Sequence, residues 1–66
     1  MYKQVDKKQT ILDLVNGKIQ ESDLEKFHIV CFSDETVMDL STVELSYLMS
    51  GFIEDDSTLL FEEVDD

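Results

Sequence analysis

The chain has no proline, tryptophan or arginine, and among its 66 residues it has one cysteine, one histidine and two glycines. A single cysteine excludes an internal disulfide, and one cysteine with one histidine argues against a structural zinc site. Without arginine or a glycine-rich loop, phosphate has neither a clamp nor a backbone cradle. No apolar run reaches membrane-spanning length and no signal-like segment is visible, so we expect a cytoplasmic protein, in the host cytoplasm if it is viral.

Positive charge is missing from the last 40 residues. The five lysines are Lys3, Lys7, Lys8, Lys18 and Lys26, and five acids balance them within residues 1–26. The formal charge of −11 therefore falls on residues 27–66. Its carriers are Asp34, Glu35, Asp39, Glu44, Glu54, Asp55, Asp56, Glu62, Glu63, Asp65 and Asp66. Such a surface repels phosphates, so we expect no direct nucleic-acid binding and no anionic membrane, but a basic surface of a DNA-binding protein or enzyme as partner.

The length predicts one small acidic domain over residues 1–66, close to the lower limit of what folds alone. The hydrophobic content of 42% is that of a globular protein rather than a disordered tail. With no disulfide or metal to add stability, a tight core or a homodimer must supply it.

The N-terminal part allows two interpretations. Ile11, Leu14 and Val15 have helical spacing, and Asn16-Gly17 can end a helix over residues 7–16. Alternatively, Asn16-Gly17 is a type I′ turn between strands 10–15 and 18–21. Ser22-x-x-Glu25 has the spacing of a capping box and can start a single helical turn.

Branched and aromatic residues predict strands over residues 27–33, 36–40 and 58–64. Strict alternation places Asp39 opposite Met38 and Leu40, and Leu60 opposite Leu59 and Phe61. The fold class is therefore predicted as α+β. It comprises a small antiparallel three-stranded sheet with one or two helices packed on one face, in the order helix, β-hairpin, helix, strand.

A second helix is predicted after residue 40. Ser41-x-x-Glu44 has the capping-box spacing, and Gly51 can close the helix. One apolar stripe is predicted to face the core, formed by Leu45, Leu48, Met49 and Phe52. Val43 and Tyr47 lie off that stripe and are candidates for a second contact.

Catalytic chemistry has few candidates. His28 and Cys31 are an odd number of residues apart, so on a strand they face opposite ways and cannot form a dyad. We expect Cys31 to pack as a small apolar group and His28 to lie at a strand edge. Asp55, Asp56, Ser57 and Glu62 lack the spacing of a calcium loop. We therefore predict no enzyme activity, catalytic residue, metal or cofactor.

An acidic sheet suggests mimicry of DNA. A strand rises about 3.3 Å per residue, close to the roughly 3.4 Å rise per nucleotide along one DNA strand, so carboxylates on strands and turns can approximate a phosphate row. Such a protein would inhibit a DNA-processing enzyme by occupying its basic cleft. Specificity needs an apolar anchor, for which the candidates are Val43, Tyr47, Met38 and Phe61.

The segment Ile19-Gln20-Glu21-Ser22, followed by the acidic hairpin from His28 to Leu40, resembles the Glu-Ser motif and sheet of phage-type inhibitors of uracil-DNA glycosylase. This resemblance implies a DNA mimic that fills the glycosylase's DNA cleft and takes a protruding apolar side chain into a pocket, with Glu21 and Ser22 as the motif pair. Asp23 departs from the apolar residue expected after Ser22. The predicted partner-binding residues are Glu21, Ser22, Asp34, Glu35, Asp39, Glu44, Tyr47, Glu62 and Glu63.

A different class of function fits the same charge pattern. A regulatory binding module without DNA mimicry, such as an antitoxin or a modulator of the transcription machinery, would dock through the apolar helix face around Val43 and Tyr47. Charge reversal of the acids would weaken a mimic, whereas truncation of Tyr47 would weaken a helix-docked module.

Overall fold

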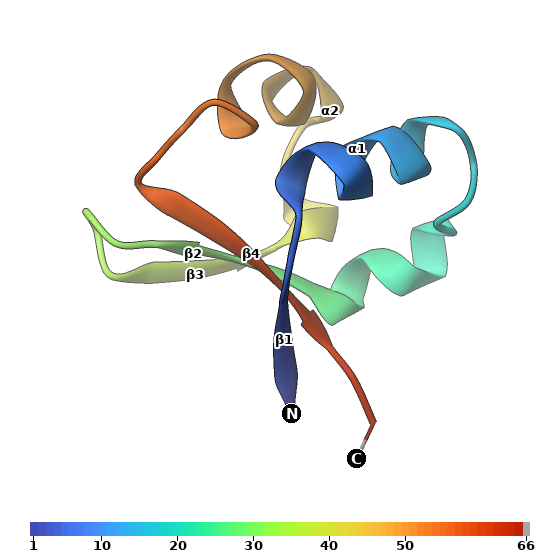
Figure 1. Cartoon of the computed structure of the whole chain (residues 1–66), viewed down its shortest axis with the longest axis horizontal. Coiled ribbons are helices and arrows are strands. Elements are labelled where there is room, and N and C mark those ends of the chain that lie inside the picture. Colours follow the sequence, from blue (N-terminus) through green and yellow to red (C-terminus); the bar gives the residue numbers. More distant parts are fainter. Residues whose placement is uncertain (66) are drawn as a thin grey trace.

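The computed structural model describes residues 1–65 and alternates short strands with short helical segments (Figure 1). The elements in chain order are β1 (Tyr2–Val5), α1 (Lys7–Val15), η1 (Glu21–Lys26), β2 (Phe27–Cys31), β3 (Thr36–Asp39), η2 (Leu40–Thr42), α2 (Leu45–Tyr47), η3 (Leu48–Phe52) and β4 (Thr58–Glu63). Both η1 and η2 are 3-10 helices, and η3 is a π-helical turn. None of the helices in this part of the chain is long and apolar enough to cross a membrane.

The four strands form one antiparallel sheet in the order β1-β4-β2-β3. The α+β class is confirmed, but the prediction of three strands is wrong because the chain adds β1 at one edge. The register pairs Tyr2 with Glu63 and Val5 with Leu60. A strand of four residues whose only partner lies at the other end of the chain is hard to predict from the local sequence.

Alternation along the strands gives the sheet two different faces. One face carries Phe27, Ile29 and Leu60, and the helical segments lie on that side (Figure 1). The core is completed from the helical side by Ile11, Leu40, Leu48 and Phe52, each at most 2% exposed. The predicted packing of helices on one face is therefore confirmed, and the opposite face of the sheet is left without a helical cover in residues 1–65 (Figure 1).

The helical interpretation of residues 7–16 is confirmed by α1, and the hairpin alternative is wrong. Asp6 caps the helix by accepting a hydrogen bond of 2.8 Å from the backbone N–H of Gln9. The helix ends at Val15 with Asn16 as its C-cap, and Gly17 follows with φ of +80°. That left-handed conformation costs a non-glycine residue energy, so the Asn-Gly pair acts as a helix stop rather than as a hairpin turn.

The helix predicted after residue 40 is confirmed over residues 45–52, but its predicted start and capping box are wrong. Val43 and Glu44 are extended, so α2 starts only at Leu45, and Glu44 makes no side-chain cap bond. Leu48 and Phe52 are buried, but Leu45 and Met49 are 49% and 54% exposed. Neither capping box forms, because Ser41 lies inside η2 and Ser22 lies inside η1, where Gln20 occupies the N-cap position without a side-chain bond.

The loop before β4 is organised by Asp55. Its Oδ1 accepts hydrogen bonds from the Ser57 hydroxyl at 2.6 Å and the Ser57 backbone N–H at 2.9 Å. These bonds, the hydroxyl bond first, lower the pKa of Asp55 below its ordinary value, and the charge of Lys7 adds to the effect.

A lowered carboxylate pKa makes the fold sensitive to acid. The folded state binds the Asp55 proton less tightly than the unfolded chain, so the stabilisation is complete above about pH 4 and is lost as the pH falls through the folded-state pKa. We expect Asp55→Asn to flatten the fall in the free energy of unfolding below about pH 4, measured by urea titration at several pH values. Asp56→Asn, at the exposed neighbour, is the control and should keep the wild-type slope. Equal slopes for both variants would contradict the assignment.

Candidate protein-binding face

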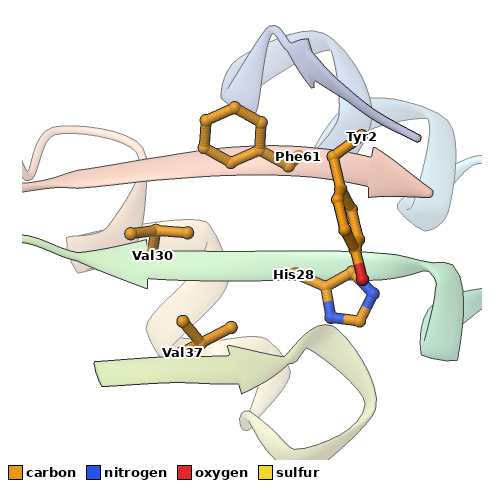
Figure 2. Close-up of a pocket in the computed structure, with 5 residues that line it drawn as sticks. All are labelled: Tyr2, His28, Val30, Val37 and Phe61. Atoms are coloured by element: carbon orange, nitrogen blue, oxygen red, sulfur yellow. The ribbon is translucent and has the colours of Figure 1, made fainter. Parts of the chain in front are cut away.

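The uncovered side of the sheet presents a continuous apolar surface. We call it the open face and define it by Tyr2, His28, Val30, Val37 and Phe61 (Figure 2). Figure 2 shows these side chains on the same side of the sheet, with at least one from each of the four strands. They line a shallow groove of about 380 Å³.

The open face follows from the alternation of side chains. In the register, Val30 is paired with Val37 across β2 and β3, and His28 is paired with Phe61 across β2 and β4. Val37 is 63% exposed and Tyr2 is 60% exposed. Contiguous exposed apolar residues, unlike scattered single ones, mark interaction sites on soluble proteins.

Two carboxylates bound one end of the open face. His28 Nδ1 lies 3.0 Å from Asp39 Oδ1, and His28 Nε2 lies 3.8 Å from Glu63 Oε2. The Tyr2 ring stands edge-on to the imidazole at 5.3 Å between centroids. The carboxylates stay accessible, since the side chains of Asp39 and Glu63 are 46% and 54% exposed. A partner can therefore reach apolar and negative groups side by side.

His28 lies on the interior strand β2 rather than at a strand edge, so that expectation is wrong. Its Nε2 is buried and makes no hydrogen bond with the described residues. Cys31 is half-buried near the end of the same strand, and its register partners place it on the helical side. The Ser33 hydroxyl, 3.2 Å from the sulfur, is the main cause of a lowered pKa of the Cys31 thiol. The predicted separation of His28 and Cys31 onto opposite faces is confirmed.

Metal-binding geometry is also not found in the described part. Within residues 1–65 no three His, Cys, Asp or Glu side chains are grouped so as to hold an ion. Asp55, the first of the acids considered for calcium, is engaged by Ser57 instead.

Of the nine predicted partner-binding residues, two, Asp39 and Glu63, lie together at one end of the open face. Glu62 follows the opposite alternation and lies on the helical side, with Lys3 and Phe27 as its register partners. Two adjacent acids of β4 thus face different surroundings, so a row of carboxylates along one strand is not observed there.

The remaining predicted residues lie in turns and helical segments. Asp34 and Glu35 form the exposed turn between β2 and β3, where Glu35 has φ of +54°. Glu21 and Ser22 begin η1 and are exposed, and Glu44 is exposed just before α2. Tyr47 packs against Phe52 with 6.2 Å between ring centroids.

The predicted apolar anchor residues also lie on different sides of the sheet. Phe61 lines the open face, whereas Met38 points to the other side of β3 and Val43 packs half-buried against the core. Sequence reasoning did not select Tyr2, His28, Val30 and Val37 as binding residues. Alternation within residues 27–33 places His28 and Val30 on one face and could have suggested both, but Tyr2 could not be found without β1.

A second apolar groove of about 310 Å³ lies among the helical segments. Leu40 and Leu48 are buried at its base, whereas Val15 and Leu45 are about half exposed. None of its lining residues carries a carboxylate or belongs to an ion pair, whereas His28 of the open face lies beside Asp39 and Glu63.

Comparisons of the chain with protein-family models, with curated proteins and with solved structures give no match.

Proposed function

We propose that this chain is a small acidic inhibitor that docks its open face onto the basic nucleic-acid cleft of a DNA-processing protein, and so acts as a DNA mimic. One observation carries the proposal: an exposed apolar groove, bounded by Asp39 and Glu63, lies on the side of the sheet that no described helix covers. The net charge of −11 supplies the long-range attraction to a basic partner.

The two components of the open face have different roles. Carboxylates steer a basic partner and fix its register, but charge alone selects poorly among basic proteins. The groove supplies specificity, because an apolar side chain that enters it removes Tyr2, Val37 and Phe61 from water. The combination suits a partner that presents a protruding apolar side chain beside lysine or arginine.

Adjacent residues of β4 provide a matched test. Glu63→Lys reverses a charge on the open face, whereas Glu62→Lys makes the same charge change on the helical side. We expect Glu63→Lys to weaken binding about 10- to 100-fold and Glu62→Lys to weaken it only a few-fold, because close charge pairs are worth more than the distant field. The measurement is titration calorimetry with a partner captured from host lysate, after circular dichroism shows that both variants are folded. Equal losses would contradict docking through the open face.

Competition with DNA separates mimicry from other protein binding. The captured partner should be released by duplex DNA, with a steep dependence on salt, and polyphosphate of equal charge should release it less well. A partner that stays bound at saturating duplex DNA would reject mimicry.

The resemblance of residues 19–22 and 28–40 to inhibitors of uracil-DNA glycosylase makes that enzyme the first specific target to examine. We expect excess protein to suppress uracil excision, and Glu21→Ala to reduce this effect if Glu21 belongs to the motif pair. Unimpaired excision would exclude this enzyme as the target, whereas DNA competition would still test the wider proposal.

A regulatory module that docks through its helical side is the second candidate, favoured by the groove between Val15 and Leu45. Tyr47, which the sequence predicts to mark this contact, packs on Phe52, so Leu45 is the better probe. Under this alternative Leu45→Asp would abolish binding and Glu63→Lys would have little effect. Under the DNA-mimic proposal the two variants would behave in the reverse way.

A further inference from the structure

Strand β3 forms an outer edge of the sheet, and the directions of its backbone groups can be deduced. The Phe32 N–H donates to the Ser57 carbonyl at 2.9 Å, so Phe32 directs its backbone toward β4. Hydrogen-bonding directions alternate along an antiparallel strand. The backbone N–H and C=O groups of Val30 and His28 are therefore also directed toward β4, and those of Cys31 and Ile29 are directed toward β3. In β3 their register partners Thr36 and Met38 therefore direct their backbone groups toward β2, and Val37 and Asp39 direct theirs away from the sheet.

A second hydrogen bond agrees with this assignment. The Thr42 hydroxyl donates to the Asp39 carbonyl at 2.8 Å from beyond the end of β3. That carbonyl is consequently not used in pairing with β2. The edge is left with the N–H and C=O of Val37 and the N–H of Asp39 directed away from the sheet.

The edge carries no lysine, proline or bulge, which are three of the features that block pairing at natural sheet edges. Residues 36–39 are Thr-Val-Met-Asp and pair in unbroken register with β2. Val37 and Met38 are 63% and 41% exposed on the two sides of the strand.

Charge at the edge selects the kind of segment that can pair with it. Val37 is followed two residues later by Asp39, on the same side of β3, and is preceded by Glu35 in the adjoining exposed turn. A strand that pairs with Val37 would place one residue opposite Asp39 and another beside the turn that carries Glu35, where basic side chains are favourable. The other edge strand, β1, contains Lys3 and is closely followed by Lys7 and Lys8, so it attracts a basic segment less.

A second copy of this chain is a poor occupant. Antiparallel pairing of two β3 strands about Val37 would bring Asp39 of each copy toward the turn that carries Glu35 of the other. Like charges brought together destabilise a strand pair, and each copy carries a net charge of −11.

We propose that the outer edge of β3 binds an extended segment of the partner protein by strand addition, with a basic-x-apolar-x-basic pattern whose central residue pairs with Val37. Residues of the bound strand on the same side as Val37 would extend the open face by one strand. The inference deepens the proposed function by describing how part of the partner is held, and it takes only the partner's basic character from that proposal.

The test uses a capped synthetic peptide of sequence TKTVTKT as the probe, and TKTPTKT as a control of equal charge that lacks the central N–H donor. The protein is assembled by ligation at Cys31, so that Val37 can be N-methylated without change of its side chain. We expect TKTVTKT to slow amide hydrogen exchange of Val37, and N-methylation to weaken its binding about 3- to 10-fold, as for the loss of one hydrogen bond. Nuclear magnetic resonance titration at low ionic strength measures both effects.

Several results would overturn the inference. These are equal binding of the two peptides, no binding of TKTVTKT, unchanged affinity after N-methylation, or Val37 protection that rises with protein concentration in the absence of peptide. If the N-methylated protein is unfolded, its Val37 N–H points inward and the assignment of the edge is wrong. Loss of binding through Glu63→Lys with no effect of N-methylation would leave the proposed function in place and remove strand addition alone.

Discussion

Replacing Phe52 with alanine is expected to lower the free energy of unfolding by about 3–5 kcal/mol, as large-to-small changes of buried aromatic residues do. Phe52 is fully buried, its ring lies against Tyr47, and the Lys7 ammonium is 4.8 Å from its centroid. A domain of 66 residues has roughly 3–10 kcal/mol of total stability. The variant should therefore lose a large share of the total stability and unfold at a much lower urea concentration than the wild type, as measured by circular dichroism and urea titration.

The matched control is Phe32→Ala, at a phenylalanine that is 57% exposed beside the β2–β3 turn. This variant loses the same atoms but leaves no internal cavity, so the expected change is below about 1 kcal/mol. Similar destabilisation at the two positions would mean that Phe52 is not at the centre of the core.

The strands that sequence predicted best are those whose neighbours are buried. Ile29 and Leu60 are register partners in the centre of the sheet and are both fully buried. Their surroundings are rich in branched and aromatic residues because both strands are covered on the helical side. Local composition therefore carries the signal for β2 and β4.

Strand β1 shows the limit of local reasoning. Its residues Tyr-Lys-Gln-Val have mixed polarity, and three of the four are exposed. They become a strand because β4 offers an unpaired edge, with Val64 N–H donating to the Met1 carbonyl at 2.9 Å just beyond the paired residues. A contact between the two ends of the chain cannot be seen in any short window of sequence.

The start of the helix predicted after residue 40 was wrong for a tertiary reason. Leu40 is 1% exposed at the end of the hairpin, and Val43 must also reach the core, which is compatible with the extended backbone observed at Val43. The helix then starts late and contains a π-helical turn, so Leu48 and Phe52 face inward while Met49 does not. Core packing overrode the regular helical period on which the prediction depended.

The residues at the candidate binding face were also predictable only where the local sequence was informative. Sequence identified Asp39 and Glu63 as acids but could not place both beside His28, because their proximity depends on the strand order β3-β2-β4. It named Phe61 as an anchor candidate, whereas the contribution of Tyr2 required β1. The charge of the open face was thus predictable, and its apolar floor was predictable only in part.

Lys7→Met is expected to destabilise the fold by about 2–3 kcal/mol. The Lys7 ammonium donates hydrogen bonds to the Phe52 carbonyl at 3.1 Å, to Thr58 Oγ1 at 2.7 Å and to the Asp55 carbonyl. Methionine preserves much of the apolar stem, so the change mainly removes a charged donor from half-buried acceptors that no other lysine reaches among residues 1–65. Urea titration measures the loss.

Lys8→Met removes the same charge from the next residue of α1, which is exposed, and should change stability by no more than about 0.5 kcal/mol. A difference between the two variants isolates the hydrogen bonds of Lys7 from the general effect of lowering the positive charge. Lys7 joins the start of α1 to the end of η3 and the start of β4, which are 45 or more residues away in the sequence. If Lys7→Met and Lys8→Met lost equal stability, the contribution of Lys7 would come from the general electrostatic field and not from its hydrogen bonds. A high salt concentration would then bring the free energy of unfolding of both variants to that of the wild type.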